Sequence, residues 1–122
     1  MTQNKSNFAP PEAMQKLEKL GIKIQTEFVW DLTESYAIAR NNINPENIAE
    51  HLPAATLEEL LSICPKFINA KQYDYDHSII LSMEFFNGEF GLGYQGVQFL
   101  YHKDPKQAVI QMIEWCVEQG YI

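Results

Sequence analysis

Seven residues between positions 82 and 102 have side chains or backbone properties that could support chemistry. They are one hydroxyl, two carboxylates, two glycines, one amide and one imidazole: Ser82, Glu84, Glu89, Gly91, Gly93, Gln98 and His102. A carboxylate beside an imidazole can serve as general acid and base. Glycines inside a strand often mark the close approach of a ligand or of another backbone. The seven residues would form a shallow groove with a glycine floor and an acid–base rim.

This arrangement requires a β-meander over residues 78–102. Residues 78–86 alternate between apolar and other side chains, which predicts a strand. Asn87-Gly88 follows, and this dipeptide favours a two-residue type I′ hairpin because both central residues need positive φ. The expected pairs are Phe85 with Phe90, Met83 with Leu92 and Leu81 with Tyr94.

Gln95-Gly96 fits a second two-residue turn, which would place a third strand beside the second. The expected pairs are Tyr94 with Val97, Leu92 with Phe99 and Phe90 with Tyr101. One face would then be apolar across three strands, and the seven candidate residues would lie on the other, with Glu89 opposite His102. A slip of one residue in either turn would exchange the faces.

A solvated sheet face accounts for the same residues without any activity. Polar pairs are common on the open side of an antiparallel sheet, and one cross-strand ion pair stabilises it only slightly. We favour this interpretation, so the seven residues are a candidate surface site and we assign no catalytic, cofactor-binding or metal-binding residue.

Two other groups of residues could bind metal or form covalent bonds. Asp74, Asp76 and His77 offer metal ligands, but their spacing matches neither a zinc site nor an EF-hand. We therefore expect no metal and no cofactor. Cys64 and Cys116 fall on apolar stripes of predicted helices, which favours buried free thiols, although their spacing leaves a disulfide open.

Three helices are predicted, over residues 11–20, 56–64 and 105–119. The first begins after Pro10-Pro11 and ends before Gly21, and the second begins with a capping box formed by Thr56 and Glu59. The third has Asp104 as its cap and Gly120 after its end. Its apolar stripe should pack on the apolar face of the meander.

The remaining segments complete an α+β fold. Strands are expected over residues 23–31, 36–39 and 66–70, and helical turns over 45–52. We predict an antiparallel sheet of four to five strands that contains the meander of residues 78–102, with the strand near Phe28 joining it and the helices mainly on one face. Residues 1–7 should be a flexible N-terminus, followed by a single domain over residues 8–122.

Charge and composition restrict the function classes. The net charge of −7 is spread along the chain, and no basic patch occurs, which argues against nucleic-acid binding. The N-terminal residues lack the hydrophobic run of a signal peptide, and no apolar stretch reaches the length of a membrane span. Two cysteines without an export signal favour a reducing compartment. We expect a soluble protein of the cytoplasm that does not bind membranes.

Three segments together resemble a group of small uncharacterised proteins encoded by bacteriophages, prophages and other mobile elements, commonly in gut bacteria. The segments are residues 17–30 (LEKLGIKIQTEFVW), 52–61 (LPAATLEELL) and 108–122 (AVIQMIEWCVEQGYI), about a third of the chain. The group has a helix, a glycine and Glu-Phe-x-Trp, then an L-P-x-x-T-x-x-E-L helix, and a closing helix that ends in E-x-G. The resemblance implies an accessory protein of mobile-element origin, and it provides no catalytic residue to carry over.

The function that fits these observations best is that of a non-catalytic accessory protein acting through protein–protein contact, with a homodimer as one form of that contact. One alternative is an inhibitor or immunity-type protein whose acidic surface blocks a basic partner such as a nuclease. A second alternative is a small enzyme or ligand-binding domain that uses the polar face of the meander.

Overall fold

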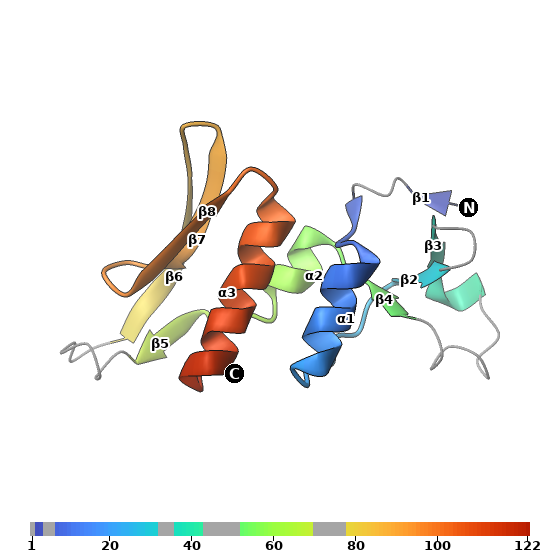
Figure 1. The fold of residues 1–122 in the computed structure, drawn as a ribbon, viewed down its shortest axis with the longest axis horizontal. Coiled ribbons are helices and arrows are strands. Elements are labelled where there is room, and N and C mark those ends of the chain that lie inside the picture. Colours follow the sequence, from blue (N-terminus) through green and yellow to red (C-terminus); the bar gives the residue numbers. More distant parts are fainter. Residues whose placement is uncertain (1, 4–6, 32–35, 43–51, 70–77) are drawn as a thin grey trace. The chain divides into compact units, whose positions relative to one another are not determined.

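The computed structural model describes residues 2–3, 7–31, 36–42, 52–69 and 78–122 (Figure 1). Helices and antiparallel strands are both present, so the α+β class is confirmed. The chain divides into two compact units, Met1–Leu61 and Ser62–Ile122. The expected flexible N-terminus and the single domain over residues 8–122 stay predictions.

The first unit contains a sheet of four strands. The strands are β1 (Thr2–Gln3), β2 (Phe28–Asp31), β3 (Tyr36–Ala39) and β4 (Leu52–Ala54), in the order β1-β3-β2-β4 with antiparallel neighbours. The expectation that the strand near Phe28 joins the meander is therefore wrong. Its partners come from nearby in the sequence, since Phe28 lies opposite Ala39 and Ala54.

Two of the boundaries in this unit differ from the sequence predictions. The strand expected over residues 23–31 begins only at Phe28, and β4 was not predicted. Pro53 argues against a strand in the sequence because proline lacks a backbone donor. It is tolerated in β4 because β4 is an edge strand. Leu52 is thus the start of a strand, while the rest of the helical turn predicted over residues 45–52 lies outside the described residues.

The helices of this unit follow their predicted caps. They are α1 (Pro11–Lys19), the 3₁₀ turn η2 (Arg40–Asn42) and α2 (Leu57–Leu61). The capping box is confirmed: the Thr56 amide donates to Glu59 Oε1 at 2.9 Å, and the Glu59 amide donates to Thr56 Oγ1 at 3.2 Å. However, α2 ends at Leu61, three residues earlier than predicted, and Pro65 disfavours helical backbone in Cys64.

Aromatic packing joins the segment before α1 to the β1–β4 sheet. The Phe8 ring lies 5.2 Å from that of Phe28 and 6.1 Å from that of Trp30, measured between centroids. Trp30 Nε1 donates to the carbonyl oxygen of Ala9 at 3.0 Å, and Trp30 is buried. Trp30 is therefore part of the core of this unit.

The second unit contains the meander and the last helix. Its strands are β5 (Phe67–Asn69), β6 (Ser78–Phe86), β7 (Glu89–Tyr94) and β8 (Gln98–His102), all antiparallel in the order β5-β6-β7-β8, followed by α3 (Pro105–Gln119). Both the meander over residues 78–102 and the helix over residues 105–119 are confirmed.

The turn between β6 and β7 has the predicted form. Asn87 and Gly88 have φ values of 51° and 77°, as a type I′ turn requires. The structure confirms all three expected pairs: Phe85 with Phe90, Met83 with Leu92 and Leu81 with Tyr94.

The turn between β7 and β8 is one residue longer than predicted, and the register of β8 is wrong by one position. The Val97 amide donates to the Tyr94 carbonyl at 2.9 Å, and Gly96 has φ 79°. Val97 nevertheless belongs to the loop, because β8 begins only at Gln98. The observed pairs are Tyr94 with Gln98, Leu92 with Leu100 and Phe90 with His102. Because side chains alternate along a strand, this shift exchanges the two faces of β8.

Two glycines of β7 allow the close approach of β8, whose aromatic rings lie against Gly91 and whose backbone lies against Gly93. Gly91 lies opposite Tyr101, and a Cβ atom at Gly91 would be 2.5 Å from Tyr101 Cε1. Gly93 lies opposite Phe99, and a Cβ atom there would meet the Gln98 carbonyl oxygen and would be 2.7 Å from Phe99 Cα. Neither position has room for a larger residue without a shift of its neighbour.

α3 covers the other face of this sheet and contacts β7 and β8. Asp104 caps it by accepting from the Lys106 amide, and Gly120 ends it with φ 80°. The ring of Trp115 stacks on Tyr94 at 6.1 Å. The buried residues of α3 form its apolar stripe; they are Ala108, Val109, Ile110, Met112, Ile113 and Cys116.

We predict that Gly93→Ala lowers the free energy of unfolding by about 3 kcal/mol and Gly91→Ala by about 1 kcal/mol. At Gly93 the new methyl group would meet backbone atoms, whereas at Gly91 it would meet a tyrosine ring that can rotate away. Urea unfolding of both variants measures the difference. An equal or larger loss at Gly91 would show that the rings, rather than the β8 backbone, limit the space.

Candidate functional site

The register of β8 divides the seven candidate residues between two faces. Ser82, Glu84, Gly91 and Gly93 share the face turned away from α3, and Glu89 lies on it at the hairpin end. The other two, Gln98 and His102, pair with Tyr94 and Phe90 and lie on the face that α3 covers. The predicted groove therefore does not form as a single site.

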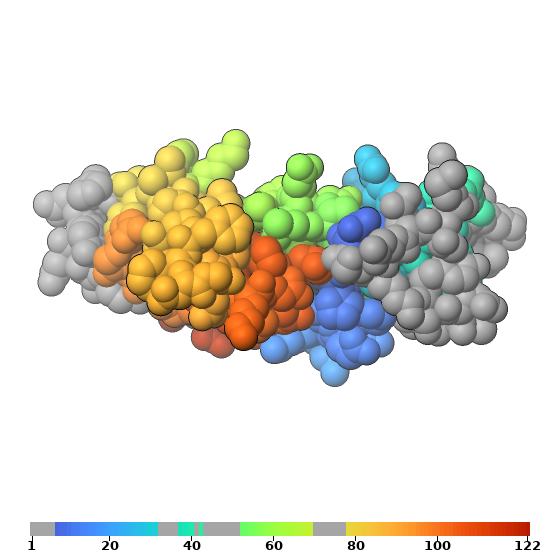
Figure 2. Space-filling view, turned by 90° about the horizontal axis from the view of Figure 1, so that it is seen from above, coloured from blue at the N-terminus to red at the C-terminus, as the bar shows by residue number. Residues whose placement is uncertain are grey.

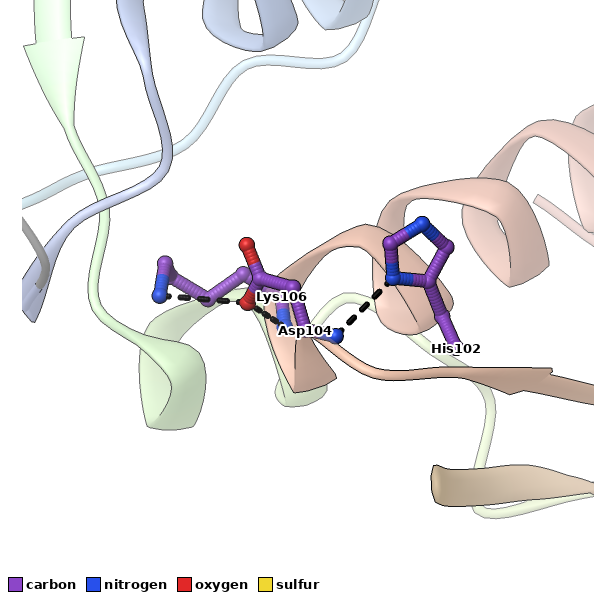
Figure 3. A network of polar contacts seen from close by, with 3 residues as sticks. All are labelled: His102, Asp104 and Lys106. Atoms are coloured by element: carbon purple, nitrogen blue, oxygen red, sulfur yellow. Dashed lines mark hydrogen bonds and ion pairs between the residues drawn. The ribbon is translucent and has the colours of Figure 1, made fainter. Parts of the chain in front are cut away.

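His102 has a structural contact at the start of α3. Its Nδ1 atom accepts from the Asp104 amide at 2.9 Å (Figure 3). Asp104 Oδ1 in turn accepts from the Lys106 amide at 3.0 Å and lies 3.3 Å from Lys106 Nζ. The three residues fix the path from β8 into the helix.

The expected pair of Glu89 and His102 is wrong. His102 lies opposite Phe90, and β8 ends there, so Glu89 extends one position beyond the strand. The acid–base pair on which the enzyme alternative depends is absent from these residues.

Tyr101 occupies the face where sequence reasoning placed His102. Its hydroxyl group donates to Glu84 Oε1, so the side chain of Tyr101 reaches from β8 across β7 to β6. This hydrogen bond raises the pKa of Tyr101 above its ordinary value, because loss of the proton would remove the donor. Tyr101 was missed by the sequence analysis, although the match of Gly91-x-Gly93 with Phe99-x-Tyr101 could have indicated it.

Ser82 does not present its hydroxyl group to solvent. Ser82 Oγ is buried, and it lacks a hydrogen-bond partner in the described part of the chain. A substrate could not reach this atom without movement of the side chains above it. Ser82 therefore does not act as an accessible nucleophile in this structure.

The face turned away from α3 carries large apolar side chains beside its polar ones, which are Asn69, Ser78, Ser82, Glu84 and Glu89. We call it the outer face and define it by Phe67, Ile80, Ser82, Glu84, Phe86, Phe99 and Tyr101. Four of these side chains are large and exposed; their exposed fractions are 60% for Phe67, 66% for Ile80, 61% for Phe86 and 41% for Tyr101.

The exposed side chains of the outer face form a continuous surface. Ile80 lies opposite Phe67 on the neighbouring strand. The Tyr101 ring lies 6.5 Å from that of Phe86 and 5.3 Å from that of Phe99. Phe99 lies opposite Gly93, which in turn pairs with Ser82, so β8 and β6 are joined across the glycines.

The end of the β6–β7 hairpin is exposed on both sides. Because β8 ends opposite Phe90, only two strands continue to the turn, and Figure 1 shows the hairpin extending past the start of α3. Met83 and Phe85, on the side of α3, are 51% and 77% exposed. Figure 2 looks down on this turn, and the yellow atoms of the hairpin lie uncovered in that view.

The two cysteines are buried free thiols, as predicted. The Cys116 thiol donates to the Tyr94 hydroxyl oxygen at 3.9 Å, and that hydroxyl group donates to the Pro65 carbonyl at 2.7 Å. Burial raises the pKa of Cys64 to about 12 and also raises the pKa values of Cys116 and Tyr94. The thiolate is the reactive form, so neither cysteine is suited to nucleophilic catalysis.

The described residues were compared with the requirements of a metal cluster and of a membrane-spanning helix. Within them, no cluster of three or more histidine, cysteine, aspartate or glutamate side chains could hold a metal ion. Asp74, Asp76 and His77 lie outside the described ranges. Among the helices that the structure describes, none has the length and apolar character needed to cross a membrane.

Comparison with known protein families, curated proteins and solved structures finds no match. Function is therefore inferred from the geometry of the chain itself.

We predict that the stability of the protein falls between pH 9 and pH 12 and that Cys64→Ala reduces this loss. The thiol has a pKa near 9 when unfolded and about 12 when folded. Its contribution is thus fully present below pH 9 and is lost as the pH rises, by up to about 1.4 kcal/mol per pH unit. Urea unfolding at a series of pH values measures the slope.

Val109→Ala is the matched control for this experiment, because Val109 is equally buried and carries no ionisable group. It should lower stability by the same amount at every pH. If Cys64→Ala has the same alkaline slope as the unmodified protein, the burial of this thiol does not control the slope.

Proposed function

We propose that this protein is a small non-catalytic accessory protein that acts through protein–protein contact, and that the outer face is its contact surface. The observation that carries the proposal is the exposure of Phe67, Ile80, Phe86 and Tyr101 on one sheet face. Large apolar side chains on an open sheet face lose favourable burial unless another surface covers them.

The extent of this surface supports the proposal. Taking ~200 Å² for one fully exposed large side chain, the four exposed fractions amount to about 450 Å². Apolar patches of this size on single chains are frequently functional. Aromatic residues are also enriched at protein interfaces, and three of the four side chains are aromatic.

The charges beside the outer face favour an apolar contact over electrostatic capture. Glu84 is hydrogen-bonded to Tyr101, and Glu89 lies at the hairpin end. Lys66 and Lys103 are exposed next to β5 and β8. Because these lysines flank a face whose own charges are carboxylates, the surroundings give little support to an acidic inhibitor of a basic partner, and the face lacks the basic patch that nucleic acids require.

The origin and location belong to the same proposal. The resemblance of residues 17–30, 52–61 and 108–122 to mobile-element proteins favours an accessory role in a bacterial cytoplasm. Two buried, unpaired cysteines are compatible with a reducing compartment.

We predict that Ile80→Thr/Phe86→Thr abolishes capture of a partner from a lysate of the host, whereas Phe85→Thr does not. Both changes replace exposed residues of β6, but Phe85 lies on the opposite face. Affinity capture with tagged protein, at low and high salt, measures the effect. Far-UV circular dichroism and thermal unfolding establish that each variant is folded.

Three outcomes separate the alternatives. Loss of the partner only in the double variant, at both salt concentrations, supports an apolar contact at the outer face. Equal capture by all three proteins would place the contact elsewhere. Loss of the partner from the unmodified protein at high salt would favour the acidic inhibitor instead.

A further inference from the structure

We infer that the occupant of the outer face is a second copy of this chain, so that the protein forms a symmetric homodimer through the β5–β8 sheet. This inference rests on the proposed function, because it assigns a partner to the same surface. Three properties of the outer face support it: the exposed apolar area, the residue types, and the positions of its large side chains relative to the glycines.

The exposed apolar area matches what one subunit contributes to a stable dimer. A standard interface buries roughly 800 Å² on each partner. Between about 57% and 65% of that area is apolar, with homodimers at the upper end, which corresponds to roughly 450 to 520 Å². The outer face offers about 450 Å² from four side chains alone, before the half-buried Phe99 is included.

The composition of the outer face suits contact with an identical surface. It carries no lysine or arginine, so a partner with acidic side chains gains no ion pair there. Of its two carboxylates, Glu84 accepts a hydrogen bond from Tyr101 within the same face, and Glu89 lies at the hairpin end. Two copies can therefore meet without leaving the Tyr101 hydroxyl group unpaired.

The relief of the face also suits a self-complementary contact. Tyr101 and Phe99 lie across the glycines of β7, which have no side chains to separate the rings from the strand. Phe67 and Ile80 lie on β5 and the first part of β6, and Phe86 lies at the far end of β6. In a contact with two-fold symmetry, the end with Phe67 and Ile80 can pack against the Phe86 end of the other copy, or against its own counterpart. Sheets that pack face to face lie at a separation of roughly 10 Å.

The net charge of −7 on each copy gives this dimer a distinctive salt dependence. Like charges oppose association over distances beyond the contact itself, and added salt screens that repulsion. We therefore expect the homodimer to become tighter as the salt concentration rises. A contact with a basic partner would change in the opposite direction.

Sedimentation equilibrium of the full chain tests the inference. The unmodified protein should reach twice the monomer mass as its concentration increases through the micromolar range. Ile80→Thr/Phe86→Thr should raise the dimer dissociation constant about a hundredfold, since two large apolar contacts are lost from each copy. Phe85→Thr, on the opposite face of the same strand, should leave the constant unchanged.

Hydrogen exchange on dilution locates the contact independently of these substitutions. As dimer converts to monomer, the amides of β6 and β8 should lose protection, while those of β2 should be unaffected. A monomer at every concentration and salt overturns the inference. A dimer that the double variant does not weaken, or one that loosens as salt is added, also overturns it.

The two levels of the proposal fail in different ways. If the unmodified protein is monomeric but the double variant still loses a captured protein of different mass, the outer face is a contact surface for another partner and only the homodimer is excluded. If the protein is monomeric and captures nothing through the outer face, both are excluded.

Discussion

The approach of β8 to the glycines of β7 is the contact on which the second unit depends. At Gly93 the neighbouring atoms belong to the backbone of Gln98 and Phe99, so the two strands can pair at this distance only because no side chain intervenes. At Gly91 the same freedom lets the Tyr101 ring lie over β7 and reach Glu84 on β6. Three strands are thereby joined on one face by side chains as well as by the backbone ladder.

One consequence of this register is a sheet with two apolar faces. On one face α3 covers Leu92 and Tyr94, which are buried, while Met83 and Phe85 remain exposed near the hairpin end. The opposite face receives Phe99 and Tyr101 in place of the amide and imidazole groups of Gln98 and His102. A one-residue difference in a turn thus places large apolar side chains where a polar groove was expected, and it removes the Glu89–His102 pair on which the enzyme alternative depended.

The physical origin of each prediction explains which ones succeeded. Caps and the Asn87-Gly88 turn depend on local backbone conformation, so the sequence identifies them directly. The second turn is different. Only Gly96 has positive φ there, and a loop of two residues and a loop of three residues both allow a glycine with positive φ at this position. Hydrophobic alternation could not decide between them, since residues 99–101 are all apolar. The choice depends on the space at Gly91 and Gly93, which is a contact between strands rather than a pattern along one.

The same distinction applies to the first unit and to the candidate site. Residues 23–31 indicated a strand, but a strand's own pattern does not identify its partners, and Phe28 pairs within the β1–β4 sheet. Similarly, the residue types in β6 and β7 indicated a surface of interest without identifying what β8 would add to it. A glycine-x-glycine strand followed by an aromatic-x-aromatic strand contains the missing information, because the rings need the space that the glycines leave. That steric match, rather than charge or hydrophobicity, determines which side chains of β8 share a face with Gly91 and Gly93.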